Sequence, residues 1–173
     1  MSIIHRVKLL VAFSALLIFA GCSAPKQVKK DRPCHPLTQQ AFLDQPFYIP
    51  MKMAHFEDAY GSKFRLRKFL RDVPHVKTRK DTIYRFHHGP TSMLFYLTPE
   101  QDTTFLTSKI ADPSIELRPC IRVGLSRKRL EGLIQHFPSN TLDTVTIAND
   151  KRQAVFIFKE RRLQTIYINN YFK

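Results

Sequence analysis

The side chains of this chain that could do chemistry are a few histidines, cysteines and carboxylates, and their spacing matches none of the common catalytic motifs. His87 and His88 are adjacent among β-forming residues, and neighbours on a strand point to opposite faces, so they could share a metal ion only at a bend. The chain has no Gly-x-Ser-x-Gly, His-Glu-x-x-His or Cys-x-x-Cys sequence. We therefore expect no catalytic residue, no metal site and no cofactor.

The first 22 residues carry the strongest pattern. Arg6 and Lys8 precede an apolar run of about twelve residues, which is too short to span a bilayer, and small Ala20 and Gly21 stand before Cys22. This pattern predicts a secretion signal over residues 1–21. An ordinary cleaved signal and an uncleaved anchor remain alternatives.

The run that ends Phe19-Ala20-Gly21-Cys22 resembles the lipobox of bacterial lipoproteins. The resemblance implies that the signal is cleaved before Cys22, which becomes the first residue of the mature protein. Cys22 then carries acyl chains that bind the membrane. No Asp follows Cys22, so the family's sorting rule implies the outer membrane, on its periplasmic face. Proline and lysine over residues 22–50 predict a tether, with its apolar residues packed onto the domain: Phe42, Leu43, Phe47, Tyr48 and Ile49.

The charge of the chain is strongly positive. It has 28 Lys and Arg against 14 Asp and Glu, and two of the basic residues lie within residues 1–21, which leaves a net charge of +12 afterwards. Such an excess commonly serves nucleic acid, but export excludes that partner. The remaining anionic partners are lipid or lipopolysaccharide phosphates, peptidoglycan carboxylates and acidic proteins of the envelope. Solubility alone is the alternative use.

Two further cysteines, Cys34 and Cys120, would lie in an oxidising compartment after export. They could form a disulfide. Cys120 could instead serve as a small buried apolar side chain, because it lies in an alternating apolar stretch.

An internal repeat predicts the fold. Asp81-Thr82-Ile83 is matched by Asp143-Thr144-Val145, and two further β-rich runs follow each of these at similar spacing. Each set predicts a three-stranded antiparallel meander, preceded by a helix with one apolar stripe: Leu66, Phe69, Leu70 and Val73 in the first, and Leu130, Leu133, Ile134 and Phe137 in the second. We expect an α+β fold of two tandem modules, residues 51–115 and 116–173.

The entry to the second helix, Ile121-x-Val123-Gly124-Leu125-Ser126, resembles small lipoproteins of the outer-membrane β-barrel assembly machinery and tandem-repeat β-lactamase inhibitor proteins. The resemblance implies a sheet that binds protein, without catalysis. We expect a lipid-anchored envelope protein with a binding or scaffold role toward a protein or an anionic envelope component. An inhibitor of a periplasmic or lysozyme-like enzyme and an envelope hydrolase are the alternatives.

Two surfaces are candidates for that role. Alternation along the last strand places Ile166, Ile168 and Phe172 toward the core, and leaves Tyr167 and Tyr171 on the other side. That side could bind a partner, or the tether could cover it. A helix usually runs antiparallel to the next strand, so the start of the second helix should lie beside the turn at residues 149–152. This arrangement predicts an anion-binding patch formed by Arg127, Lys128, Arg129, Lys151 and Arg152. Five solvated side chains that serve only solubility are the alternative.

Overall fold

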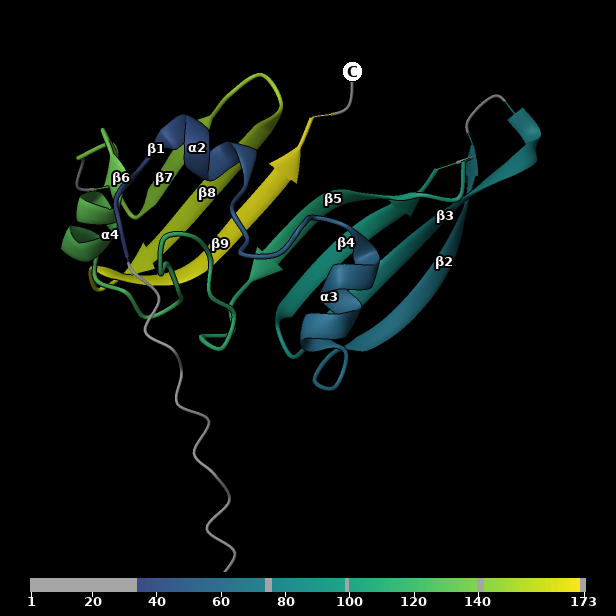
Figure 1. Ribbon diagram of the computed structural model, residues 1–173, viewed down its shortest axis with the longest axis horizontal. Coiled ribbons are helices and arrows are strands. Elements are labelled where there is room, and N and C mark those ends of the chain that lie inside the picture. The colour runs from purple at the N-terminus through teal and green to yellow at the C-terminus, as the bar shows by residue number, and fades with distance from the viewer. Residues whose placement is uncertain (1–33, 74–75, 99, 140–141, 172–173) are drawn as a thin grey trace, which may run out of the picture. The chain divides into compact units, whose positions relative to one another are not determined.

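The computed structural model describes residues 34–73, 76–98, 100–139 and 142–171. The predicted signal peptide and Cys22 lie outside the described residues. Within them the chain forms a large antiparallel sheet with short helices, which is an α+β fold (Figure 1).

The sheet has seven strands in the order β2-β3-β4-β5-β9-β8-β7. Their bounds are β2 Arg65–Val73, β3 Val76–His88, β4 Thr91–Leu97, β5 Thr103–Ile110, β7 Thr144–Ala148, β8 Arg152–Lys159 and β9 Arg162–Asn170. Successive strands pair as hairpins, and β5 pairs with β9 in the middle of the sheet. The six strands predicted for the two meanders are confirmed, and the pairing of β5 with β9 joins both meanders into one sheet.

Helices α2 (Gln39–Asp44) and α3 (Met53–Tyr60) lie on the same face of the sheet, α2 over β7 and β8 and α3 over the other half (Figure 1). Phe56 of α3 is fully buried and meets Phe47, Phe95 and Phe105 at ring-centroid distances of 4.9, 5.2 and 6.5 Å. Phe42 of α2 lies 5.9 Å from Phe156 of β8. Aromatic packing under the two helices therefore forms the core on this covered face.

The helix predicted at Leu66 to Val73 is wrong, because these residues form strand β2. The i, i+3, i+4 spacing of the apolar residues suits a helix, but nine residues of β2 pair with β3 in a long hairpin. Tertiary pairing outweighs a weak helical preference. The helix of this half is α3, which lies upstream, so the first half does not repeat the second as predicted.

Helix α4 (Arg127–Leu133) begins as predicted, since the side chain of Ser126 accepts a hydrogen bond from the Arg129 backbone N–H at 3.3 Å. It ends earlier than the apolar stripe predicts. Ile134–Gln135 forms the short strand β6, which pairs in parallel with β1 (Leu37–Thr38). The whole stripe is nevertheless buried.

The described part of the predicted tether, residues 34–50, folds together with the rest of the described chain. Thr38 caps α2 by accepting a hydrogen bond from the Ala41 backbone N–H at 3.1 Å. Phe42, Leu43 and Phe47 are buried, which confirms that these apolar residues pack onto the domain. The segment is thus part of the fold at least from residue 34.

Candidate binding surface

The second face of the sheet is covered by no helix of the described chain (Figure 1). Residues directly opposite each other on neighbouring strands share a face, so the strand register defines this uncovered face. One row across it reads Arg65, His87, Ser92, Lys109 and Tyr167, and the next reads Arg67, Arg85, Leu94, Thr107 and Asn169. A third row contains Phe69, Ile83 and Tyr96. The uncovered face therefore carries basic, polar, apolar and aromatic side chains.

Three arginines gather on the β2–β3 part of this face. Arg65 lies opposite His87 and Arg67 lies opposite Arg85, and we call these four residues the arginine cluster. Like charges that face each other across antiparallel strands lower stability. Among the described residues, none of the three arginines forms an ion pair. The cluster is thus an unneutralised concentration of positive charge.

The positive charge of the arginine cluster affects the imidazole of His87. It is half-buried, and its Nε2 atom is buried with no hydrogen-bond partner in the described part of the chain. Desolvation, followed by the positive charges of Arg67, Arg85 and Arg65, lowers the pKa of His87. An anion bound at the cluster would relieve this repulsion.

The uncovered face also carries the carboxylate Asp81, which lies opposite Arg71. The hydroxyl of Tyr96 donates a hydrogen bond to Asp81 at 3.0 Å. Asp81 therefore accepts a hydrogen bond from Tyr96 at a position four residues along β3 from Arg85.

In the last strand, β9, the described side chains lie on the faces that the alternation predicted. Ile166 and Ile168 are fully buried, while Tyr167 is half-buried on the uncovered face and Tyr171 is 46% exposed. The Lys109 ammonium lies 6.0 Å from the centre of the Tyr167 ring, at the limit of a cation–π contact. Phe172 lies outside the described residues.

The predicted patch of five basic residues is wrong. The backbone N–H of Arg127 donates to the Arg161 carbonyl at 2.9 Å, and its guanidinium donates to the Leu142 carbonyl and lies 4.1 Å from the centre of the Phe158 ring. The start of α4, with Lys128 and Arg129, is therefore beside the β8–β9 turn. Lys151 and Arg152 lie at the other end of the β7–β8 hairpin.

The reason for this error is the path between α4 and β7. Strand β6 follows the helix and pairs with β1, and the chain then returns so that β7 begins, rather than ends, beside the helix start. Arg152 is also unable to serve an external anion. Its side chain is buried and donates to the Leu43 carbonyl, to the Asp44 carbonyl at 3.1 Å and to Asn170 Oδ1 at 2.5 Å.

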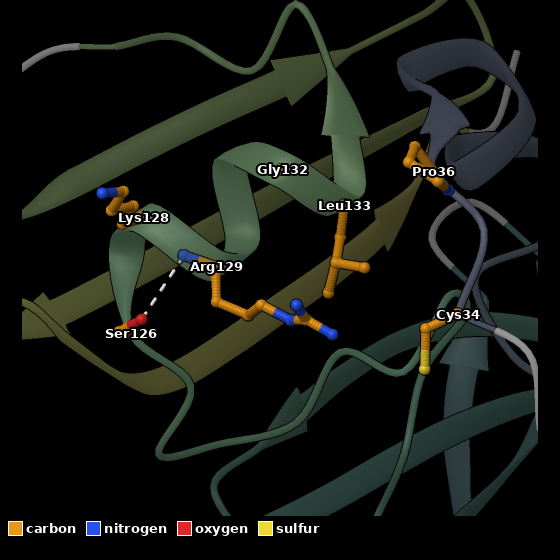
Figure 2. A pocket seen from close by; sticks show the side chains of 7 residues that line it. All are labelled: Cys34, Pro36, Ser126, Lys128, Arg129, Gly132 and Leu133. Carbon is orange, nitrogen blue, oxygen red and sulfur yellow. Dashed lines mark hydrogen bonds between the residues drawn. The ribbon is translucent and has the colours of Figure 1, made fainter. Parts of the chain in front are cut away.

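Cys34 and Cys120 form a disulfide, with their Cα atoms 5.6 Å apart. Beside it is a shallow pocket of about 480 Å³ lined by Cys34, Pro36, Ser126, Lys128, Arg129, Gly132 and Leu133 (Figure 2). The side chain of Arg129 extends along the pocket, whereas Lys128 points away from it. No carboxylate lines this pocket, and nothing in its lining forms a pair of acid and base groups.

In the described part of the chain, no group of three or more His, Cys, Asp or Glu residues could hold a metal ion. None of the helices in that part of the chain is long and apolar enough to cross a membrane. No family model, curated protein or solved structure matches the chain.

The arginine cluster was not predicted from the sequence. Arg65 and Arg67 alternate along the chain, as do Arg85 and His87, and this period of two is the signal that could have found them. It was hidden by the assignment of Leu66 to Val73 to a helix.

Proposed function

We propose that this protein is a lipid-anchored protein of the bacterial outer membrane that binds an anionic envelope partner without catalysis. The uncovered face of the sheet is the binding surface. The observation that carries the proposal is the arginine cluster, in which Arg67 and Arg85 face each other and no described carboxylate neutralises them. The repulsion between these arginines lowers the stability of the free protein, and an anion bound between them would offset it.

Aromatic groups extend this surface across the sheet. Tyr96 and Tyr167 lie on the same face, and tyrosine offers a large contact area together with a hydroxyl group. Lys109 stands beside Tyr167. The positive part of the face would attract an anionic partner, and the aromatic part would contact it once bound.

The binding experiment uses charge reversal. Arg85→Glu should weaken capture of the partner from envelope extract, and should flatten its decline with rising salt, because fewer charge pairs remain to be screened. Arg122→Glu is the matched control, because Arg122 is an exposed arginine in a loop outside the cluster. Equal capture by Arg85→Glu and the unmodified protein would refute the binding role of this face.

The tyrosine side of the face has its own test. Tyr167→Ala should weaken capture with little effect on the thermal unfolding midpoint, since the ring is only half-buried. If the midpoint and capture fall together, Tyr167 serves the core and not the partner. Tyr171→Ala is expected to behave in the same way as Tyr167→Ala.

The membrane anchor is supported by Arg6, Lys8, the apolar run and the small residues before Cys22. Cys22→Ala should leave an unacylated precursor and abolish fatty-acid labelling. Undiminished labelling of this variant would remove the anchor from the proposal, while the binding role of the sheet would stand.

A further inference from the structure

Strand β2 is an open edge of the sheet. In the strand order it is terminal and has β3 as its one neighbour among the described strands. An edge strand presents backbone N–H and C=O groups that no neighbouring strand occupies. At nine residues β2 is long for an edge, whereas the opposite edge, β7, has five residues. The sheet therefore offers one long edge to which another strand could be added.

The side chains of β2 are unusually apolar for an exposed edge. Leu66, Phe69 and Leu70 are 41%, 44% and 61% exposed, and they make up three of the five large exposed hydrophobic side chains of the described chain. Leu66 lies opposite Phe86 and so belongs to the covered face, while Phe69 lies opposite Ile83 on the uncovered face. Exposed apolar groups thus stand on both sides of the strand, where the side chains of an added strand would contact them.

The charge of β2 selects what can be added. Arg65, Arg67, Lys68 and Arg71 lie on this strand, against Asp72 alone. A second copy of the chain would bring four cations against four, so edge-to-edge self-association is disfavoured. A partner strand that carries carboxylates meets the opposite condition, because each carboxylate gains a basic neighbour.

Basic residues on an edge can also serve only to prevent aggregation. Proteins that block an edge in this way commonly keep the edge strand short or free of exposed apolar groups. Strand β2 is long and carries three exposed apolar side chains. Its charges repel basic strands and favour acidic ones, while its length and its three apolar side chains remain available. These features together favour a selective edge over a closed one.

We propose that β2 binds an extended acidic segment of another protein, which adds to the sheet as a further strand. Backbone hydrogen bonds along β2 would supply affinity, and Leu66 and Leu70, which share one face of the strand, would contact alternate apolar side chains of the segment. The basic residues of β2 would pair with its carboxylates. This inference rests on the proposed function, since it names the anionic partner and places it at the β2 border of the uncovered face.

The test uses a synthetic peptide of about eight residues in which Glu and Val alternate, a length that can pair along most of β2. A second peptide has the same number of Glu residues but proline in place of two valines, so that it keeps its charge and cannot form a strand. Binding to the full chain is measured by titration. Amide hydrogen exchange then reports whether residues 65–71 or residues 144–148 become protected.

We expect the Glu-Val peptide to bind, to slow exchange over residues 65–71 and to leave residues 144–148 unchanged. Arg67→Glu combined with Lys68→Glu should weaken binding at least about tenfold, because both charges then repel the peptide. Leu70→Ser should also weaken it without unfolding the chain, since Leu70 is largely exposed. Arg122→Glu is the control and should bind as the unmodified protein does.

Several results would overturn strand addition. These are equal binding of the proline peptide, absence of binding by the Glu-Val peptide, and protection of residues 144–148 in place of residues 65–71. The two proposals fail separately. If Arg85→Glu reduces capture from envelope extract while Leu70→Ser, which leaves the arginine cluster intact, does not, the uncovered face binds the partner and the edge does not.

Discussion

Arg67 and Arg85 lie directly opposite each other on β2 and β3, so two guanidinium groups face each other across an antiparallel pair. Oppositely charged residues at such a site stabilise a sheet, and like charges destabilise it. Removal of one charge should therefore stabilise the free protein while it removes part of the proposed anion site. Few surface substitutions raise stability and lower binding together, so this combination distinguishes a functional cluster from a solvated surface.

We predict that Arg85→Gln raises the free energy of unfolding by about 0.2 to 1 kcal/mol and weakens capture of the envelope partner. Chemical denaturation measures the first effect, and capture across a salt series measures the second. Arg122→Gln, outside the cluster, should change neither. A less stable Arg85→Gln protein would mean that the guanidinium makes a favourable contact and that repulsion does not dominate at this site.

His87 should make the stability of the protein sensitive to acid. Its pKa in the folded state lies below the ordinary value of 6.5, so the folded state binds this proton more weakly than the unfolded state does. The part of the stability that depends on neutral His87 is therefore fully present above pH 6.5. It is lost as the pH falls from 6.5 through the lowered pKa. Unfolding midpoints measured between neutral and acidic pH should decline less steeply for His87→Gln than for the unmodified protein.

The same residue reports on binding. An anion bound at the arginine cluster offsets the charges of Arg67, Arg85 and Arg65, so the pKa of His87 should rise toward its ordinary value. Titration of the imidazole by NMR, with and without the acidic Glu-Val peptide, measures this shift. An unchanged pKa with bound peptide would place the peptide away from the cluster.

The six meander strands could be predicted because their signal is local. Runs such as Met93–Leu97 and Ala154–Phe158 contain β-branched and aromatic residues with turn residues on either side, and each run folds as a single strand. Strand β2 could not be predicted in this way. Its apolar residues fit a helical spacing, and its strand conformation comes from pairing with β3.

The candidate site depended on relationships that lie outside any local window. Arg67 and Arg85 meet only through the β2–β3 register, so a strand misassigned as a helix conceals their contact. The predicted basic patch failed for a similar reason. The pairing of β6 with β1, almost a hundred residues earlier in the chain, sets the path that separates Arg127 from Arg152.

Arg152 should be a structural residue. Its buried guanidinium donates hydrogen bonds to the Leu43 and Asp44 carbonyls, which belong to the last turn of α2, and to Asn170 of β9. Arg152→Met keeps an apolar side chain of similar length but leaves these acceptors unsatisfied, so the free energy of unfolding should fall by about 2 to 3 kcal/mol. Its neighbour Lys151 is exposed, and Lys151→Met should change the free energy of unfolding by less than about 0.5 kcal/mol. Equal stability of the two variants would show that the hydrogen bonds of Arg152 contribute little.

The Cys34–Cys120 disulfide should contribute a large part of the stability, because it joins residues 86 positions apart. In the chain-entropy model, closing a loop of this length restricts the unfolded chain by up to about 4 to 5 kcal/mol. The folded contacts nearby do not depend on the bond alone, since the Tyr48 hydroxyl accepts a hydrogen bond from the Cys120 backbone N–H at 3.0 Å and the Arg118 N–H donates to the Pro46 carbonyl at 2.8 Å. We therefore expect the variant with Cys34→Ser and Cys120→Ser to fold with a lower unfolding midpoint. A thiol reductant should lower the midpoint of the unmodified protein to a similar value and leave that of the double variant unchanged. If reductant has no effect on the unmodified protein, the bond either does not form in solution or does not restrict the unfolded chain.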